Sequence, residues 1–185
     1  MTIEKTDFPG LIVVTPNVFG DSRGYFFESF NQKEFLKEGL HYNLVQDNQA
    51  RSVYGVIRGL HYQLEPHAQT KLVRVLWGAI LDVVVDIRVG SPTYGKHFSI
   101  ELSSENKKQL LVPRGFAHGY SVLTESAEVF YKCDAYYSKE HEGGVSWNDP
   151  ALGIDWKIPP DKVILSEKDT KYPTLQNCTN NFIFI

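Results

Sequence analysis

The sequence predicts an all-β protein, a sandwich or a barrel, and two patterns lead to this prediction. Short apolar segments recur about every 10 to 15 residues, turn-forming residues separate them, and helix-length periodicity is absent between them. Residues 79–89 alternate with the period of a strand in a sheet with one well-buried face. The apolar face of this segment consists of Leu81, Val83, Val85, Ile87 and Val89. The opposite face carries Asp82, Asp86 and Arg88 together with Ile80 and Val84.

The other elements follow in chain order. Before the alternating segment, expected strands cover residues 11–15, 25–30, 44–48, 56–63 and 71–77. Residues 31–39 are expected to form a helix, because Asn31 is a good N-cap and Gly39 a good stop signal. After the alternating segment, expected strands cover residues 98–102, 109–112, 117–122 and 129–137. A short helix is expected near Pro160, and the apolar residues 182–185 are expected to form an added edge strand or a dimer contact.

Length, composition and charge limit the classes of protein. A chain of 185 residues predicts a single domain over residues 1–185. With 42% hydrophobic and 22% charged residues, the chain is expected to fold, and its net charge of −3 argues against a nucleic-acid partner. No apolar run approaches the roughly 20 residues of a membrane span. The polar N-terminus lacks a secretory signal, and the two cysteines are expected as reduced thiols, so we expect a cytoplasmic location without membrane contact.

Two motifs resemble the paired motifs of cupins, whose fold is a double-stranded β-helix jelly roll. His61 lies six positions after Gly55, and His118 ends a Pro-x-Gly-x-x-His motif, as two histidine ligands do in metal cupins. The other two ligand positions differ, because Gln63 replaces a histidine and Lys71 replaces a glutamate. A lysine ammonium has no lone pair for a metal and repels a cation. We therefore expect an organic cation at this position and no metal.

Histidine, lysine and tyrosine together suit proton transfer next to a ketone. A neutral imidazole can remove a proton from the carbon beside the carbonyl, and an ammonium can stabilise the enolate oxygen. A tyrosine hydroxyl can return a proton to the opposite face, and a carboxylate on the far imidazole nitrogen can fix its tautomer. Spacing alone does not choose among the tyrosine and aspartate candidates.

Many separate segments, in order, resemble the dTDP-4-dehydrorhamnose 3,5-epimerase family. The matching segments are residues 21–28, 45–48, 55–63, 71–74, 113–119, 131–133, 147–150, 153–156 and 165–169. The resemblance implies that His61 is the base, with Asp169 as its orienting carboxylate. It also implies that Lys71 steadies the enolate at the C4 oxygen and that Tyr131 is the acid. The family inverts C3 and C5 of dTDP-4-dehydro-6-deoxy-glucose, and the resemblance implies no cofactor.

The resemblance also implies which residues bind the substrate. Cationic side chains suit a diphosphate, and an aromatic face suits the thymine ring. The implied diphosphate or sugar contacts are Arg23, Arg58 and Lys168. Polar contacts are implied for Glu28, Gln46, Asn48, Gln63, His118 and Glu142, and Tyr137 is the implied stacking platform.

Members of this family are homodimers, so the resemblance implies a homodimer in which Arg23 and Glu28 act in the neighbouring subunit. The sequence departs from the family pattern at Thr70, where glycine is usual, and at residues 134–135. Residues 177–185 match no part of the pattern. Lys71 itself is unaffected by these departures.

Three alternatives stay open at the level of sequence. A relative that inverts only C3 or only C5 would share His61 and Lys71. A metal-dependent cupin is opposed by Lys71. A sugar-nucleotide binder without activity would bind the ligand without turnover.

Overall fold

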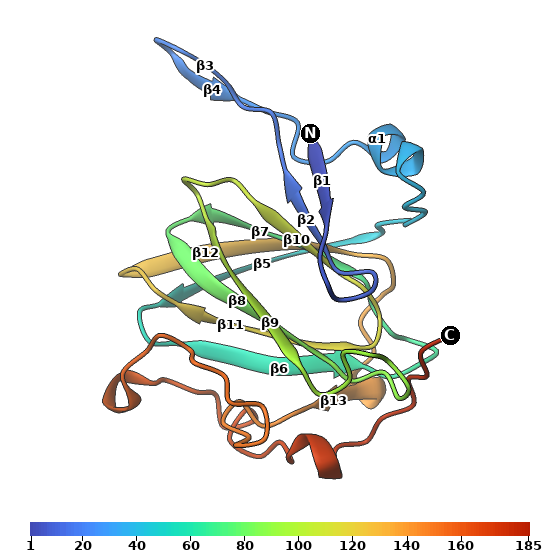
Figure 1. Ribbon diagram of the computed structural model, residues 1–185. Coiled ribbons are helices and arrows are strands. Elements are labelled where there is room, and N and C mark those ends of the chain that lie inside the picture. Colours follow the sequence, from blue (N-terminus) through green and yellow to red (C-terminus); the bar gives the residue numbers. More distant parts are fainter.

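Two antiparallel sheets face each other in the computed structural model, which describes residues 1–185 (Figure 1). The six-stranded sheet has the order β1 (Thr2–Lys5), β2 (Ile12–Thr15), β10 (Gln109–Val112), β7 (Lys71–Trp77), β12 (Ser126–Cys133) and β5 (Gln46–Val53). The five-stranded sheet has the order β13 (Glu142–Gly144), β6 (Ile57–Gln63), β11 (Phe116–Val122), β8 (Ala79–Asp86) and β9 (His97–Ser103). From β5 onward the chain passes repeatedly from one sheet to the other, as in a jelly roll. The predicted all-β cupin fold is confirmed.

Few elements lie outside the two sheets. Strands β3 (Phe19–Asp21) and β4 (Gly24–Phe26) form a hairpin that projects from the barrel (Figure 1). The helices are α1 (Gln32–Lys37) and the short 3₁₀ helices η1 (Lys139–His141), η2 (Pro160–Lys162) and η3 (Leu175–Asn177). None of these helices combines the length and the apolar character needed to cross a membrane.

The main hydrophobic core lies between the sheets. It contains 14 buried residues, and both sheets contribute to it, for example Val73 of β7 and Val84 of β8. A second cluster of 13 buried residues lies on the outer side of the five-stranded sheet, where Leu152, Trp156 and Phe182 of the C-terminal segment pack on it. Trp156 also donates a hydrogen bond from Nε1 to the carbonyl of Trp147, at 2.8 Å.

The second cluster corrects the sequence prediction for β8. The prediction of one buried face is wrong, because both faces of this strand are buried. Leu81, Val83, Val85 and Ile87 pack under the C-terminal segment, while Asp82 and Asp86 on the opposite face are each 0% exposed. Val89 lies beyond the end of the strand and is 55% exposed. The alternation therefore marks two buried environments of different polarity.

Most predicted elements are present, with shifted ends. The Asn31 side chain caps α1 by accepting from the amides of Lys33 and Glu34. The strand expected over residues 129–137 ends at Cys133, because the Asp134 side chain accepts from the Thr70 amide (2.7 Å) and the chain turns away. The strand expected over residues 25–30 is confined to Gly24–Phe26, and the strand expected over 44–48 is Gln46–Val53. The 3₁₀ helix η2 lies where a short helix is predicted.

The last residues form a single bridge and no strand. Ile183 pairs in parallel with Val89, and Phe182 is buried in the second cluster. The amide of Val89 donates to the carbonyl of Phe182 at 3.0 Å, and the amide of Phe184 donates to the carbonyl of Val89 at 2.9 Å. The expected edge strand is therefore reduced to one pair of backbone hydrogen bonds.

Candidate active site

A cavity of about 240 Å³ opens between the two sheets. Strands β5, β6, β7, β11 and β12 contribute residues to its walls, and Lys168 comes from the C-terminal segment. The walls are formed by Ala50, Arg58, His61, Lys71, His118, Gly119, Tyr120, Tyr131 and Lys168. The sequence-predicted residues His61, Lys71, Tyr131, Arg58, His118 and Lys168 are thus brought together. A neighbouring cavity of about 270 Å³ shares Arg58, His61 and Lys168 and adds Asp169.

Close backbone contact between β6 and β11 sets the two histidines side by side. His61 and His118 are direct partners in the strand register. Gly59 adopts φ +130°, and a Cβ at this position would lie 2.5 Å from the Cα of Gly119. Only glycine fits here, since any side chain would push the strands apart.

His61 is paired with Asp169. The His61 Nε2 to Asp169 Oδ1 distance is 2.5 Å, and the Ser166 hydroxyl donates to Asp169 Oδ2 at 2.8 Å. Burial alone would raise the pKa of Asp169, but the hydrogen bonds from His61 and Ser166 outweigh it and hold the pKa below its usual range. With Nε2 directed at a carboxylate, Nδ1 carries the free lone pair.

Burial makes His61 a neutral base. Burial lowers the pKa of His61, and this effect is larger than that of Asp169, which raises the pKa. The imidazole is therefore uncharged at neutral pH and able to accept a proton.

Lys71 and Tyr131 face the same space from β7 and β12. The Lys71 Nζ lies 5.9 Å from the centroid of the Tyr131 ring. Burial lowers the pKa of Lys71, which has no carboxylate within salt-bridge distance. Burial raises the pKa of Tyr131 to about 12, so its hydroxyl keeps its proton at neutral pH.

A second histidine–carboxylate pair borders the cavity, and the sequence analysis missed its acid. The His118 Nε2 to Asp82 Oδ1 distance is 2.7 Å, and Asp82 is fully buried. Tyr120, the register partner of Asp82 on β11, also lines the cavity and was missed. The available signal was an acidic residue within the apolar run of residues 79–85, which is costly unless it is paired.

The residues expected at the nucleotide form a connected rim. Lys168 Nζ lies 2.6 Å from Glu142 Oε1, and the Tyr137 hydroxyl donates to Glu142 Oε2 at 3.3 Å. Gln46 accepts from the Tyr137 amide at 3.1 Å and donates to Asn48 Oδ1 at 3.1 Å. The Tyr137 side chain is 54% exposed, so its ring is accessible from solvent.

Arg58 and Gln63 differ in how many of their polar side-chain atoms remain free to bind a ligand. Arg58 donates from Nε to the Ser52 hydroxyl at 3.0 Å, which leaves the outer guanidinium nitrogens for a ligand. Gln63 donates to the carbonyl of His67 at 2.8 Å and accepts from the amide of Ser138 at 2.6 Å. Its amide therefore joins two loops at the rim, and its contact with substrate stays a prediction.

Arg23 and Glu28 lie apart from the cavity of their own chain. Arg23 lies in the turn of the β3–β4 hairpin, which projects from the barrel (Figure 1). Its side chain is 88% exposed and pairs with Asp21 at 2.6 Å. Glu28 accepts from the Asn31 side chain at 3.1 Å. Neither residue lines the cavity described above.

No three histidine, cysteine, aspartate or glutamate side chains are grouped so that they could hold a metal ion. His61 and His118 are each directed through Nε2 to a different carboxylate.

Comparison with known proteins identifies the family. The family model described as dTDP-4-dehydrorhamnose 3,5-epimerase matches residues 5–177. The dTDP-4-dehydrorhamnose 3,5-epimerase of Shigella flexneri is 51% identical over 91% of this chain and 93% of its own length. The crystal structure of the enzyme of that name from Elizabethkingia anophelis has a TM-score of 0.92 and 52% identity, covering 96% of this chain and 97% of that one.

A further solved structure carries a ligand. The dTDP-6-deoxy-D-glucose-3,5-epimerase of Legionella pneumophila, in complex with dTDP-4-keto-L-rhamnose, has a TM-score of 0.91 and 45% identity, covering 95% of this chain and 93% of that one. The match to the family model and the identity of about one half over nearly the whole chain, together with the paired histidine, lysine and tyrosine in one cavity, show that this chain belongs to the dTDP-4-dehydrorhamnose 3,5-epimerase family.

Proposed function

We propose that this protein inverts C3 and C5 of dTDP-4-dehydro-6-deoxy-D-glucose to give dTDP-4-dehydro-β-L-rhamnose, in the biosynthesis of dTDP-L-rhamnose. One observation supports this reaction above all: the carboxylate-bound imidazole of His61, the ammonium of Lys71 and the protonated phenol of Tyr131 line one cavity. The family match and the product-type ligand bound by the Legionella relative support the substrate. Both inversions are proton transfers without net oxidation, so the reaction requires no redox cofactor.

The first half of each inversion uses His61 and Lys71. Nδ1 of His61 removes the proton from the carbon next to the ketone, and the electron pair moves into the C4 carbonyl to form an enolate. The Lys71 ammonium stabilises the negative oxygen, an interaction of the kind that contributes about 3–4 kcal/mol when it is preorganised. Asp169 stabilises the imidazolium that forms and fixes its orientation.

The second half uses Tyr131. Its phenol donates a proton to the opposite face of the carbon, the enolate returns to the ketone, and the configuration is inverted. Tyr131 then recovers a proton from solvent while His61 releases one. General acid and base groups of this kind each contribute about 10² to 10⁴-fold.

The rim residues bind the nucleotide. Arg58 and Lys168 carry the positive charge for the diphosphate, and Tyr137 offers its exposed ring to thymine. Gln46, Asn48 and Glu142 supply polar contacts, and His118 faces the sugar.

The protein forms a homodimer in this proposal, and the hairpin of one subunit reaches the site of the other. The hairpin exposes Phe19, Tyr25 and Phe26 at 66%, 62% and 67%, which is unfavourable for an isolated chain. Arg23 and Glu28 then contact substrate in the neighbouring subunit. Mixing Arg23→Ala subunits with His61→Asn subunits should restore activity that neither variant has alone, whereas sites built from one chain would give no restoration.

We also place the protein in the cytoplasm, in keeping with its two free thiols, Cys133 and Cys178. Labelling both thiols in denatured protein taken directly from intact cells checks this location. A disulfide between them would contradict it.

Proton exchange in D₂O tests the reaction. The protein is incubated with dTDP-4-dehydro-6-deoxy-glucose in D₂O, and C3 and C5 are followed by NMR. We expect deuterium at both carbons together with inversion. Deuterium at one carbon would identify a single-centre epimerase, and binding without exchange would identify a sugar-nucleotide binder.

A further inference from the structure

The carboxylate of Asp82 is buried next to two residues of the cavity wall, His118 and Tyr120, and only one of its oxygens is hydrogen-bonded. Oδ1 faces His118 Nε2, whereas Oδ2 has no hydrogen-bond partner in the protein. The only other buried side-chain atom in this state is the hydroxyl of Tyr120, the register partner of Asp82 on β11. Buried polar atoms are nearly always satisfied, so two exceptions beside one cavity call for a functional explanation.

The polar and charged side chains around Asp82 indicate which cationic group its carboxylate stabilises. His118 and Tyr120 neighbour Asp82 on β11, and Lys71 of β7 lines the same cavity as these two residues, while the partner of Asp82 on β9 is the uncharged Ile100. Arg58 of β6 is the register partner of Tyr120 on its other side. Asp82 is thus bonded to one histidine of the cavity wall, and the Lys71 ammonium in the same wall has no salt bridge of its own.

The other anionic candidates near Lys71 are already occupied or neutral. Cys133, Asp82 and Glu142 all raise the pKa of Lys71 against the larger effect of burial. Burial raises the pKa of the Cys133 thiol, so this group is uncharged at neutral pH. Glu142 is paired with Lys168 at 2.6 Å. Asp82 is therefore the main free countercharge of Lys71.

We propose that Asp82 is a positioning residue of the epimerase site, which orients His118 through Nε2 and keeps the Lys71 ammonium charged for the enolate oxygen. The proposal rests on the proposed function, since it assigns the group that prepares Lys71 for that reaction. Without Asp82, Lys71 would face the sugar as a neutral amine over more of the pH range, and the His118 ring would lose its fixed tautomer.

The test is Asp82→Asn, which keeps the size of the side chain and removes its charge. We expect kcat to fall about tenfold or more, equivalent to about 1.4 kcal/mol, while the Kd for dTDP stays within about threefold. The pKa of Lys71 should fall, because an ammonium that loses its countercharge deprotonates at lower pH. The alkaline limb of the kcat profile should therefore move to lower pH. Asp82→Glu, which retains the charge, should move this limb back towards the wild-type position.

Asp86→Asn is the matched control, because Asp86 lies on the same strand and is equally buried. It should lower the melting temperature and leave the alkaline limb in place. An unchanged alkaline limb and unchanged kcat in Asp82→Asn would overturn the proposal, and so would an equal shift of the limb in Asp86→Asn.

A readout that needs no turnover separates this proposal from the proposed function. The pKa of Lys71 can be followed by NMR of ε-labelled lysine in wild type and in Asp82→Asn, with Lys71→Arg assigning the signal. If the wild type failed to epimerise its substrate but the Lys71 pKa still fell in Asp82→Asn, the proposed reaction would be wrong and the pairing right. An unchanged Lys71 pKa in a folded Asp82→Asn protein would refute the pairing whatever the activity.

Discussion

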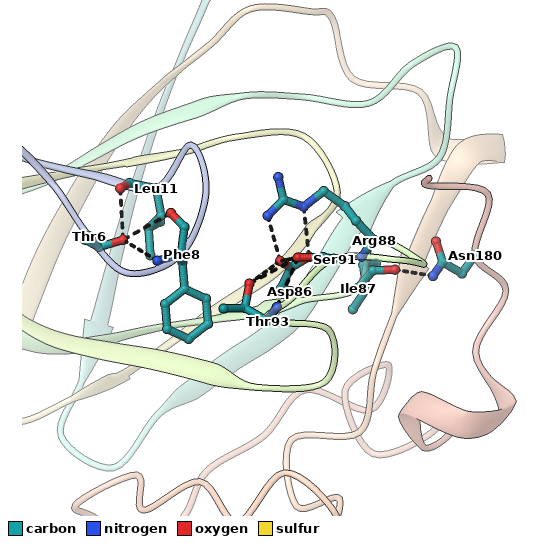
Figure 2. Close-up of polar contacts among 9 residues, drawn as sticks. All are labelled: Thr6, Phe8, Leu11, Asp86, Ile87, Arg88, Ser91, Thr93 and Asn180. Carbon is teal, nitrogen blue, oxygen red and sulfur yellow. Dashed lines mark hydrogen bonds and ion pairs between the residues drawn. The ribbon is translucent and has the colours of Figure 1, made fainter. Parts of the chain in front are cut away.

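Asp82 and Asp86 lie four residues apart on β8, both are 0% exposed, and their surroundings differ completely. Figure 2 shows Asp86 enclosed by donors from the turn that follows the strand. Its Oδ1 accepts from the amide and Nε of Arg88 at 3.0 and 2.8 Å. Its Oδ2 accepts from Arg88 Nη2, Ser91 Oγ and Thr93 Oγ1, each at 2.6 Å. Asp82 has one bonded oxygen and one free oxygen beside the cavity.

The comparison separates a stabilising carboxylate from one kept for chemistry. Arg88 lies between the rings of Phe116 and Phe184, with its Cζ 4.4 and 5.0 Å from their centroids, so the Asp86 network holds the last residues of the chain on the barrel. Nearby, the Asn180 side chain donates to the carbonyl of Ile87 (Figure 2). A fully bonded buried charge fixes structure, whereas a half-bonded one can respond to a ligand.

Removing the Asp86 carboxylate should have the largest effect. Asp86→Ala leaves the Arg88 guanidinium buried without its partner, and breaking a buried pair in this way costs about 3–5 kcal/mol. Urea denaturation should show this loss, while the folded fraction keeps its kcat. A wild-type unfolding midpoint would contradict the structural role of this carboxylate.

His61→Asn should lower activity, in contrast to Asp86→Ala, which should lower stability. Exchange at both carbons should fall by about 10²-fold or more, the scale of a lost general base, because asparagine cannot accept the proton. Deuterium incorporation measures this, with dTDP affinity within a few fold as the control for an intact site. Exchange at the original rate would assign the base to another residue.

Tyr131→Phe should separate proton abstraction by His61 from proton return by Tyr131. Exchange should continue, since His61 is intact, while inversion falls by about 10²-fold because the returning proton is lost. NMR of the product stereochemistry together with deuterium uptake separates the two steps. Undiminished inversion would exclude Tyr131 as the acid.

The pH profile should reflect the buried site groups. Burial lowers the pKa of His61, so the acid limb of kcat/KM should lie below the ordinary histidine value of about 6.5. Burial also lowers the pKa of Lys71, so the alkaline limb should lie below the ordinary lysine value of about 10.4. Rate measurements across the pH range locate both limbs, and an acid limb above the ordinary histidine value would contradict a neutral buried base.

The smallest effect is expected at the end of the chain. Phe184→Ala removes one aromatic face from Arg88, a contact worth about 0.5–1 kcal/mol. Thermal unfolding should detect a small decrease, and kcat should be unchanged. A loss of activity without loss of stability would connect the C-terminal residues to the site.

Local features of the fold were predictable because they depend on short-range chemistry. The Asn31 cap of α1 and the strand over residues 71–77 appear where the pattern placed them. The motif around His61 and His118 predicted a shared barrel interior, and the two residues are register partners. The ends of β12 and of the β3–β4 hairpin were missed, because a side-chain hydrogen bond and a turn override strand propensity there.

By itself the sequence determined the barrel, its family and the chemical types of the groups in its interior, since alternation and motif spacing act along the chain. The family resemblance implied the pair of His61 and Asp169, whereas the pair of His118 and Asp82 was visible only in the tertiary structure. Asp169 lies 108 residues from His61 and Asp82 lies 36 from His118, so the tertiary structure brings each pair together. It also decided that both faces of β8 are buried, because a segment far along the chain covers its outer side. The alternation of residues along a strand determines which way a side chain points, whereas long-range packing determines which side chain it contacts.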